Sequence, residues 1–178
     1  ESSAVVGGSG DSGTIAGFDV VTDFSTGNDD LNLFTTVIAP NTAGPFHVSG
    51  VNSSLTINGQ TVKSHSISSG IIRFDDTGNY GSALTLDSWA DVAAVVQYLQ
   101  SNDLGAANTT VAFTANIDGT DHTFIYQQVG ATQNSANDIL VDLQGVLLAS
   151  LTSGLFTTTS DPLIFDLGEA GIHFTGLA

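Results

Sequence analysis

Short runs in which apolar and polar residues alternate recur along the chain and predict β-strands. Residues 54–63 alternate on both sides of an Asn-Gly pair, the dipeptide that best accepts the two positive φ values of a type I′ turn. Residues 110–117 alternate in the same way, and the chain then turns at an Asp-Gly pair and returns through Val129. These patterns predict two hairpins.

One segment follows the period of a helix instead. Ser88 can cap the amide of Asp91 while the Asp91 carboxylate reaches back, an arrangement typical of a helix N-terminus. An apolar stripe with spacings of three, four and three follows, formed by Trp89, Val92, Val96 and Leu99. We therefore expect a mainly β (α+β) fold, an antiparallel β-sheet or sandwich, with one α-helix near residues 88–101 that packs on the sheet through Trp89, Val92 and Val96.

The segment 18–33 joins a strand-like run to a turn rich in carboxylates. On an extended chain Asp19, Val21 and Asp23 point one way. The other face carries Val20, Thr22 and Phe24. We expect this second face to be buried and the first to present oxygen ligands.

A turn is expected at residues 25–30, where Gly27 can supply a positive φ. Asp29 and Asp30 add two carboxylates before an alternating strand begins at Leu31. Calcium takes six to eight oxygen ligands from flexible loops of this kind. The segment is therefore a candidate calcium site.

The composition narrows the classes of partner. The chain has 178 residues and a formal net charge of −16, with Lys63 and Arg73 as its only strong bases. Nucleic acid and anionic membrane surfaces both require a positive protein face, so both are disfavoured. Glu1 and Glu169 are the only glutamates, so 16 of the 18 acidic residues are Asp. This bias fits turns and metal loops, and a generally solvated or halophilic surface is the alternative.

The sequence lacks the residues and motifs that several kinds of chemistry require. The chain has no cysteine, which excludes disulfides and cysteine-ligated metals. It has no apolar run long enough for a membrane span, and we expect no membrane insertion. No H-E-x-x-H or G-x-S-x-G motif is present, and the four histidines, at positions 47, 65, 122 and 173, are scattered. We expect no enzymatic activity from this domain.

The acidic segment resembles a known family. DVVTDFSTGNDDLNL, at residues 19–33, is similar to the segment that follows the glycine-rich repeats of RTX, or haemolysin-type, calcium-binding proteins exported by type I secretion. GGSGDSG, at 7–13, resembles a degenerate end of such a repeat. The order of helix, Asp-Gly hairpin and NDILVDLQGV, at 137–146, is similar to the region found after the repeats. The resemblance implies a secreted, extracellular or cell-surface protein that binds calcium.

The candidate calcium ligands follow from this pattern. The principal candidates are Asp19, Asp23, Asp29, Asp30 and Asp138, and the secondary candidates are Asp121 and Asp142. The alternative for each is a turn cap or a solvated strand face. The acidic loop at 75–82 is either a second calcium site or a solvated turn.

The tail changes character. DPLIFDL, at 161–167, resembles the start of the self-processing module of some RTX proteins, in which calcium triggers cleavage of an Asp-Pro bond. The resemblance makes Asp161 the attacking residue and Pro162 the new terminus, although Gly168, Glu169 and Ala170 stand where the family has Asp-Gly-Asp. The alternative is a strand-forming tail with a chance Asp-Pro.

We thus expect three regions: a degenerate repeat remnant at 1–13, a β-rich RTX-associated domain at 14–152, and a linker with a strand-forming tail at 153–178. The leading hypothesis is a non-catalytic calcium-binding module of a large secreted adhesin or surface protein that folds on calcium after export. A second hypothesis is that bound calcium keeps a position open for a glycan or peptide ligand.

Overall fold

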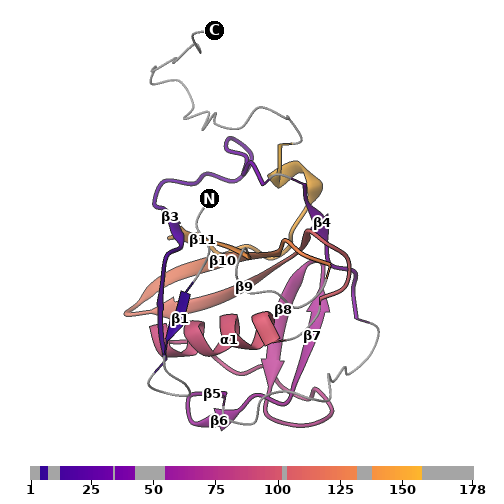
Figure 1. Ribbon diagram of the computed structural model, residues 1–178. Helices are drawn as coiled ribbons and strands as arrows, with labels where there is room; N and C mark the ends of the chain where they lie inside the picture. Colours follow the sequence, from indigo (N-terminus) through magenta and orange to yellow (C-terminus); the bar gives the residue numbers. More distant parts are fainter. Residues whose placement is uncertain are drawn as a thin grey trace, which may run out of the picture.

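The computed structural model describes residues 5–7, 13–33, 35–42, 55–101, 104–131 and 138–157. Most of the predicted repeat remnant and of the predicted tail lies outside these residues, including Asp161 and Pro162. In the described part, a main sheet has helix α1 on one face and irregular segments on the other (Figure 1). Over these described residues the fold is mainly β with one α-helix, as the sequence predicts.

Within the described residues the main sheet has seven strands: six lie in the order β3-β11-β10-β9-β8-β7, and the seventh, β4, pairs with β9 off this path. Their bounds are Asp19–Val21 (β3), Val37–Ile38 (β4), Ser64–Ser68 (β7), Ile71–Asp75 (β8), Thr109–Ile117 (β9), Thr120–Gln128 (β10) and Ile139–Gln144 (β11). Two small ribbons accompany it, formed by β1 (Val5–Gly7) with β2 (Thr14–Ala16) and by β5 (Thr56–Ile57) with β6 (Gln60–Thr61).

The sheet is mixed, which corrects the expectation of an antiparallel sheet. The pairs β3/β11, β4/β9 and β8/β9 are parallel. Parallel neighbours need a crossover connection, and α1 lies between β8 and β9 in the chain and supplies it. The helix therefore does more than cover the sheet, because it also sets the direction of β9.

Both predicted hairpin turns are present. Asn58 and Gly59 have φ values of 49° and 73° between β5 and β6. Asp118 and Gly119 have φ values of 52° and 82° between β9 and β10. Two consecutive positive φ values are what a type I′ turn requires.

Helix α1 spans Trp89–Ser101. Its capping arrangement is confirmed, because Asp91 N donates to Ser88 Oγ (3.2 Å) and Ser88 N donates to Asp91 Oδ2 (3.1 Å). Asp91 Oδ1 also accepts a hydrogen bond from Asn58 N (3.0 Å), which ties the β5–β6 ribbon to the helix. Among the helices of the described residues, none is long and apolar enough to cross a membrane.

The helix packs its apolar stripe into the larger of two hydrophobic clusters. Val92, Val96 and Leu99 are fully buried there, as predicted. Trp89 is not a core residue, because 40% of it is exposed. It lies in the first turn of the helix, and it contacts the rings of Phe18 and His122 at centroid distances of 5.8 and 5.4 Å.

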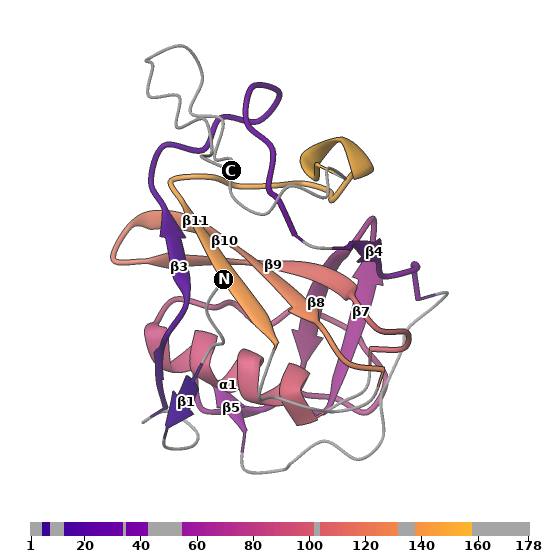
Figure 2. The same cartoon turned by 45° about the horizontal axis from the view of Figure 1, so that its top comes forward.

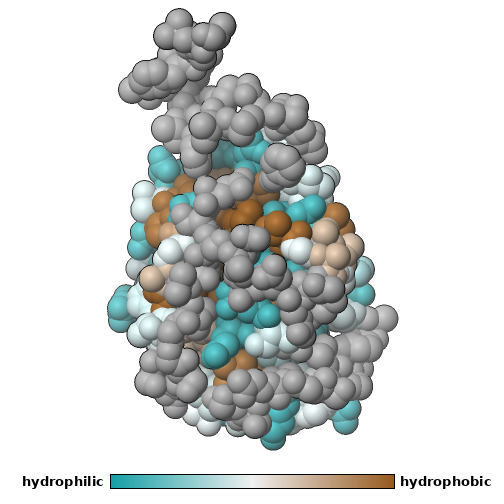
Figure 3. Space-filling view, in the orientation of Figure 1, coloured by the Kyte–Doolittle hydropathy of each residue, from teal (hydrophilic) through white to brown (hydrophobic). Residues whose placement is uncertain are grey.

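The second cluster lies on the other face of the sheet. It contains Ile71, Ala112, Ile125, Val141 and Leu143 from the strands. Its cover comes from Phe24, Leu31 and Leu33 before β4, and from Leu148, Leu151, Leu155 and Phe156 around the 3₁₀ helix η2 (Ser153–Leu155). Figure 2 shows both covering segments above the sheet. In the view of Figure 3, hydrophobic surface appears in the upper half, at the height of these segments.

The two faces of β3 are opposite to the expectation. Val20 is 51% exposed, whereas Val21 packs against the second cluster. β3 is an edge strand whose parallel register sets Val21 beside Leu143 and Val20 beside Asp142. Val21 therefore joins the buried Leu143, while Val20 lies on the other face of the edge. Phe24 is buried as expected, because the chain has already left the strand there.

Candidate functional site

The acidic turn at residues 25–30 closes on itself. Ser25 O accepts hydrogen bonds from Asn28 N and Asp29 N, both at 3.0 Å, and Asp29 Oδ2 accepts one from Ser25 N at 2.7 Å. Gly27 has the positive φ that the sequence predicts, at 89°. Asp23 and Asp30 are exposed on either side of the turn. One carboxylate thus caps the turn, and two more stand at the surface beside it.

The remaining candidate ligands lie on the sheet. Asp19 is half-buried on β3, and Asp121 is exposed on β10, where it accepts a hydrogen bond from Asn116 Nδ2 at 2.6 Å. Asp138 and Asp142 are buried. The structure therefore separates the seven carboxylates into a turn group, a strand surface and two interior positions.

Asp142 pairs with a histidine. His122 Nδ1 lies 2.9 and 3.0 Å from the two carboxylate oxygens of Asp142, and both side chains are buried. Burial raises the pKa of the Asp142 carboxyl, although its hydrogen bond with His122 acts in the opposite direction. The His122 ring also stacks on Phe124, with centroids 5.7 Å apart. Asp142 is thus held within an aromatic cluster and has a protein partner.

Asp138 also has protein partners. Tyr126 Oη donates to Asp138 Oδ2 at 2.6 Å, and Val129 N donates to Asp138 Oδ1 at 3.2 Å. Burial raises the pKa of Asp138 and, together with the neighbouring carboxylate, raises the pKa of Tyr126. The pair fastens the end of β10 to the start of β11.

The acidic loop 75–82 is organised around the buried Asp75. Thr77 N (2.8 Å) and Thr77 Oγ1 (3.1 Å) donate to Oδ1, while Gly81 N and Ser82 N donate to Oδ2. Burial opposes ionisation of this carboxyl, but the hydrogen bonds outweigh it and hold the pKa at about 2. Both oxygens already accept hydrogen bonds from the loop itself, which favours the interpretation as a turn cap over that of a second calcium site.

Within the described residues, no three His, Asp or Glu side chains gather in a group that could hold a metal ion. The predicted set of five principal ligands is therefore not assembled around one point in this part of the chain. Calcium binding stays a prediction, and the exposed carboxylates beside the turn are its candidates.

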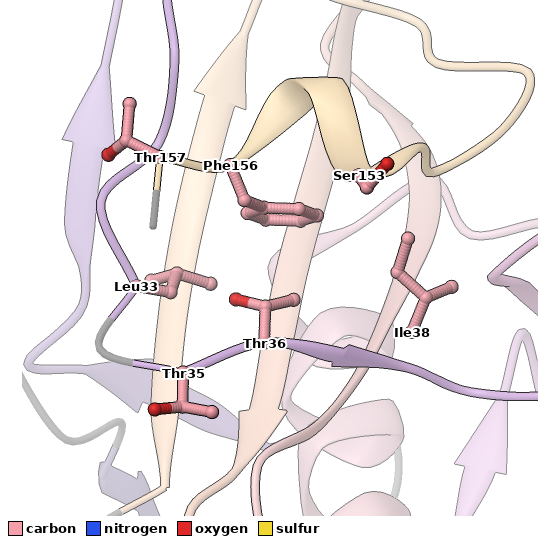
Figure 4. Close-up of a pocket in the computed structure, with 7 residues that line it drawn as sticks. All are labelled: Leu33, Thr35, Thr36, Ile38, Ser153, Phe156 and Thr157. Carbon is pink, nitrogen blue, oxygen red and sulfur yellow. The ribbon is translucent and has the colours of Figure 1, made fainter. Parts of the chain in front are cut away.

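A groove of about 360 Å³ lies on the loop-covered face. It is lined by Leu33, Thr35, Thr36, Ile38, Ser153, Phe156 and Thr157. Figure 4 shows the side chain of Thr36 pointing towards the ring of Phe156, with Leu33 and Ile38 to either side. The two walls come from segments far apart in the sequence, and no local pattern pairs them, so sequence reasoning missed this groove.

Comparison with known proteins found no match to a family model, to a curated protein or to a solved structure. The functional argument therefore rests on the residues themselves.

Proposed function

We propose that this chain is a non-catalytic module of a large secreted protein of the RTX type, an adhesin or surface protein, and that calcium stabilises it outside the cell. The support is the position of the acidic turn in the fold. Phe24 before the turn and Leu31 after it are both buried in the second cluster. Repulsion between the carboxylates at 23, 29 and 30 therefore acts on residues that close this cluster.

A bound cation removes that repulsion. Calcium accepts carboxylate and backbone oxygens in flexible geometry, and Asp23 and Asp30 are exposed beside the turn. A ligand that binds only the folded state stabilises it by RT ln(1 + [L]/Kd), about 2.7 kcal/mol at one hundred times Kd. Where calcium is scarce, as in the cytoplasm, the chain gains no such stability, and after export it does.

Thermal unfolding with calcium and with EDTA tests the proposal. At saturating calcium we expect Tm to rise by roughly 5–10 °C. The double variant Asp23→Asn/Asp30→Asn should lose most of this rise. The control Asp87→Asn/Asp118→Asn removes the same charge from exposed positions away from the turn and should keep it.

Magnesium at the same ionic strength separates site binding from general screening, because it demands stricter octahedral geometry than calcium. An equal Tm in calcium and in EDTA would end the calcium proposal. An equal rise in both double variants would show that calcium acts on the overall charge and that the turn is not its site.

A further inference from the structure

The aromatic side chains at the start of helix α1 are partly open to solvent. Trp89, the only tryptophan of the chain, is 40% exposed. Val20 on the edge strand β3 is 51% exposed, and the half-buried Phe18, two residues before it, contacts the Trp89 ring. Large apolar side chains that are exposed together mark an interaction surface. We call Phe18, Val20 and Trp89 the Trp89 patch.

The Trp89 ring is held in place from within the protein. Phe18, His122 and Phe124 contact it at centroid distances of 5.8, 5.4 and 6.0 Å. His122 is itself fixed, because its Nδ1 lies 2.9 and 3.0 Å from the two carboxylate oxygens of the buried Asp142. A ring with a fixed position loses little conformational entropy when a ligand binds, which favours binding.

The charges near the patch are negative. Asp19 lies on β3 within the patch segment, and Asp87 is exposed just before helix α1. Lys63 and Arg73 are the only strong bases of the chain, and they lie directly before β7 and on β8. These strands form the opposite side of the sheet from β3 (Figure 2). The patch therefore attracts cations and repels anions.

We propose that the Trp89 patch binds an arginine side chain on a basic segment of a partner protein. The guanidinium group is planar and weakly hydrated, and it stacks on aromatic rings, so it suits the exposed indole of Trp89. Its positive charge gains from the carboxylates of Asp19 and Asp87. Lysine carries a compact and strongly hydrated charge, which suits an apolar surface less well.

This inference goes beyond the calcium proposal and does not depend on it. Phe18 packs against the hydrophobic cluster on the helix side of the sheet. Phe24 and Leu31, which flank the acidic turn, belong to the cluster on the other face. Failure of the calcium-dependent rise in Tm would therefore leave the expected arginine binding unchanged, and the reverse also holds.

The test is an NMR titration of the isotope-labelled chain, in calcium buffer at about 0.15 M salt, with a short glycine peptide that carries two arginines. Trp89 gives the only indole N–H signal of the chain, so this signal reports on the patch directly. We expect it to shift in a saturable way together with the amide signal of Val20. The same peptide with citrulline in place of arginine keeps the shape but is neutral, and it should bind roughly fivefold more weakly.

The lysine peptide should bind with an affinity between these two. The absence of a saturable shift with the arginine peptide would overturn the proposal. Equal binding of the citrulline peptide would also overturn it, because the patch would then accept a neutral segment as readily as a basic one.

Variants separate the patch from the general negative charge of the chain. Trp89→Leu keeps every carboxylate but removes the ring, and we expect about fivefold weaker binding of the arginine peptide, measured at the Val20 amide. Trp89→Phe keeps a smaller ring and should bind with intermediate affinity. Tyr80→Leu removes a half-buried aromatic ring from the acidic loop 75–82, and as the matched control it should bind like the wild type. Wild-type binding by both Trp89 variants would contradict the proposal, because the peptide would then respond only to the overall charge.

Discussion

The two faces of the main sheet are covered in different ways. On one face α1 presents a regular stripe whose members Val92, Val96 and Leu99 are fully buried. On the other face two largely irregular segments, at 24–33 and 146–156, supply the cover. On the helix-covered face the polar side chains are buried. The loop-covered face instead carries both the acidic turn and the groove. The carboxylates of the acidic turn, which are available to bind a cation, therefore lie in one of the irregular covering segments.

Truncation of one leucine on each face tests this comparison most strongly. Leu99 is enclosed by helix and sheet, whereas Leu148 lies in a surface segment that can move inward. The loss of stability on Leu→Ala substitution depends on how far the site can collapse. We expect Leu99→Ala to cost about 4 kcal/mol and Leu148→Ala about 2 kcal/mol in urea unfolding. Equal losses would mean that both faces are equally rigid.

Acid should weaken the helix-covered face through a buried histidine. His65 Nδ1 is hydrogen-bonded to Tyr98 Oη (2.5 Å), and burial lowers the pKa of His65 to about 4. The unfolded chain takes up this proton near pH 6.5, so stability is complete above that pH and is lost as the pH falls towards 4. Over that window the loss amounts to about 3 kcal/mol.

The measurement is urea unfolding between pH 7 and pH 4 for the wild type and for His65→Gln, whose amide can still form a hydrogen bond with Tyr98. The difference between the two isolates His65, because other groups titrate in both proteins. Asp75 acts at lower pH, since its folded pKa of about 2 lies below the ordinary value of 3.8. The raised pKa values of Asp138 and Asp142 act in the opposite direction, favouring the fold as the pH falls. Parallel pH profiles for the wild type and the variant would contradict this prediction.

The sequence predicted those features whose signals are local. The apolar stripe and the pair Ser88 and Asp91 lie within one helix, and each hairpin turn is specified by two adjacent residues. Trp89 and Val20 were misplaced because a periodic pattern identifies a face but does not say how far the covering element extends. Trp89 lies at the rim of the helix contact, and Val20 lies on an edge strand.

The features that sequence reasoning missed depend on distant segments. The parallel pairing of β8 with β9 follows from the crossover through α1, and the bridge between Leu31 and Phe156 joins the two covering segments. Neither contact leaves a pattern in the residues around it. The sequence identifies each candidate carboxylate by its residue type, but it does not show which of them are buried. Asp138 and Asp142 are buried, and predicting this would require knowledge of the sheet register.

The smallest predicted effect concerns the contact between the sheet and the loop segments that cover it. Two Gly→Ala variants test this contact. Gly70 ends the turn between β7 and β8 with φ at 75°, and a Cβ there would lie 2.7 Å from Leu151 Cβ and 2.9 Å from Ile38 Cγ2. Gly59 has nearly the same φ, at 73°, but a Cβ there would meet no atom within 4 Å. Both Gly→Ala variants carry the same backbone strain, about 1 kcal/mol. Only Gly70→Ala must also push the covering segment away, and we expect a further loss of about 2 kcal/mol in urea unfolding. If the two variants lost equal stability, the loop cover would yield freely, and the groove whose wall includes Ile38 would not be a fixed site.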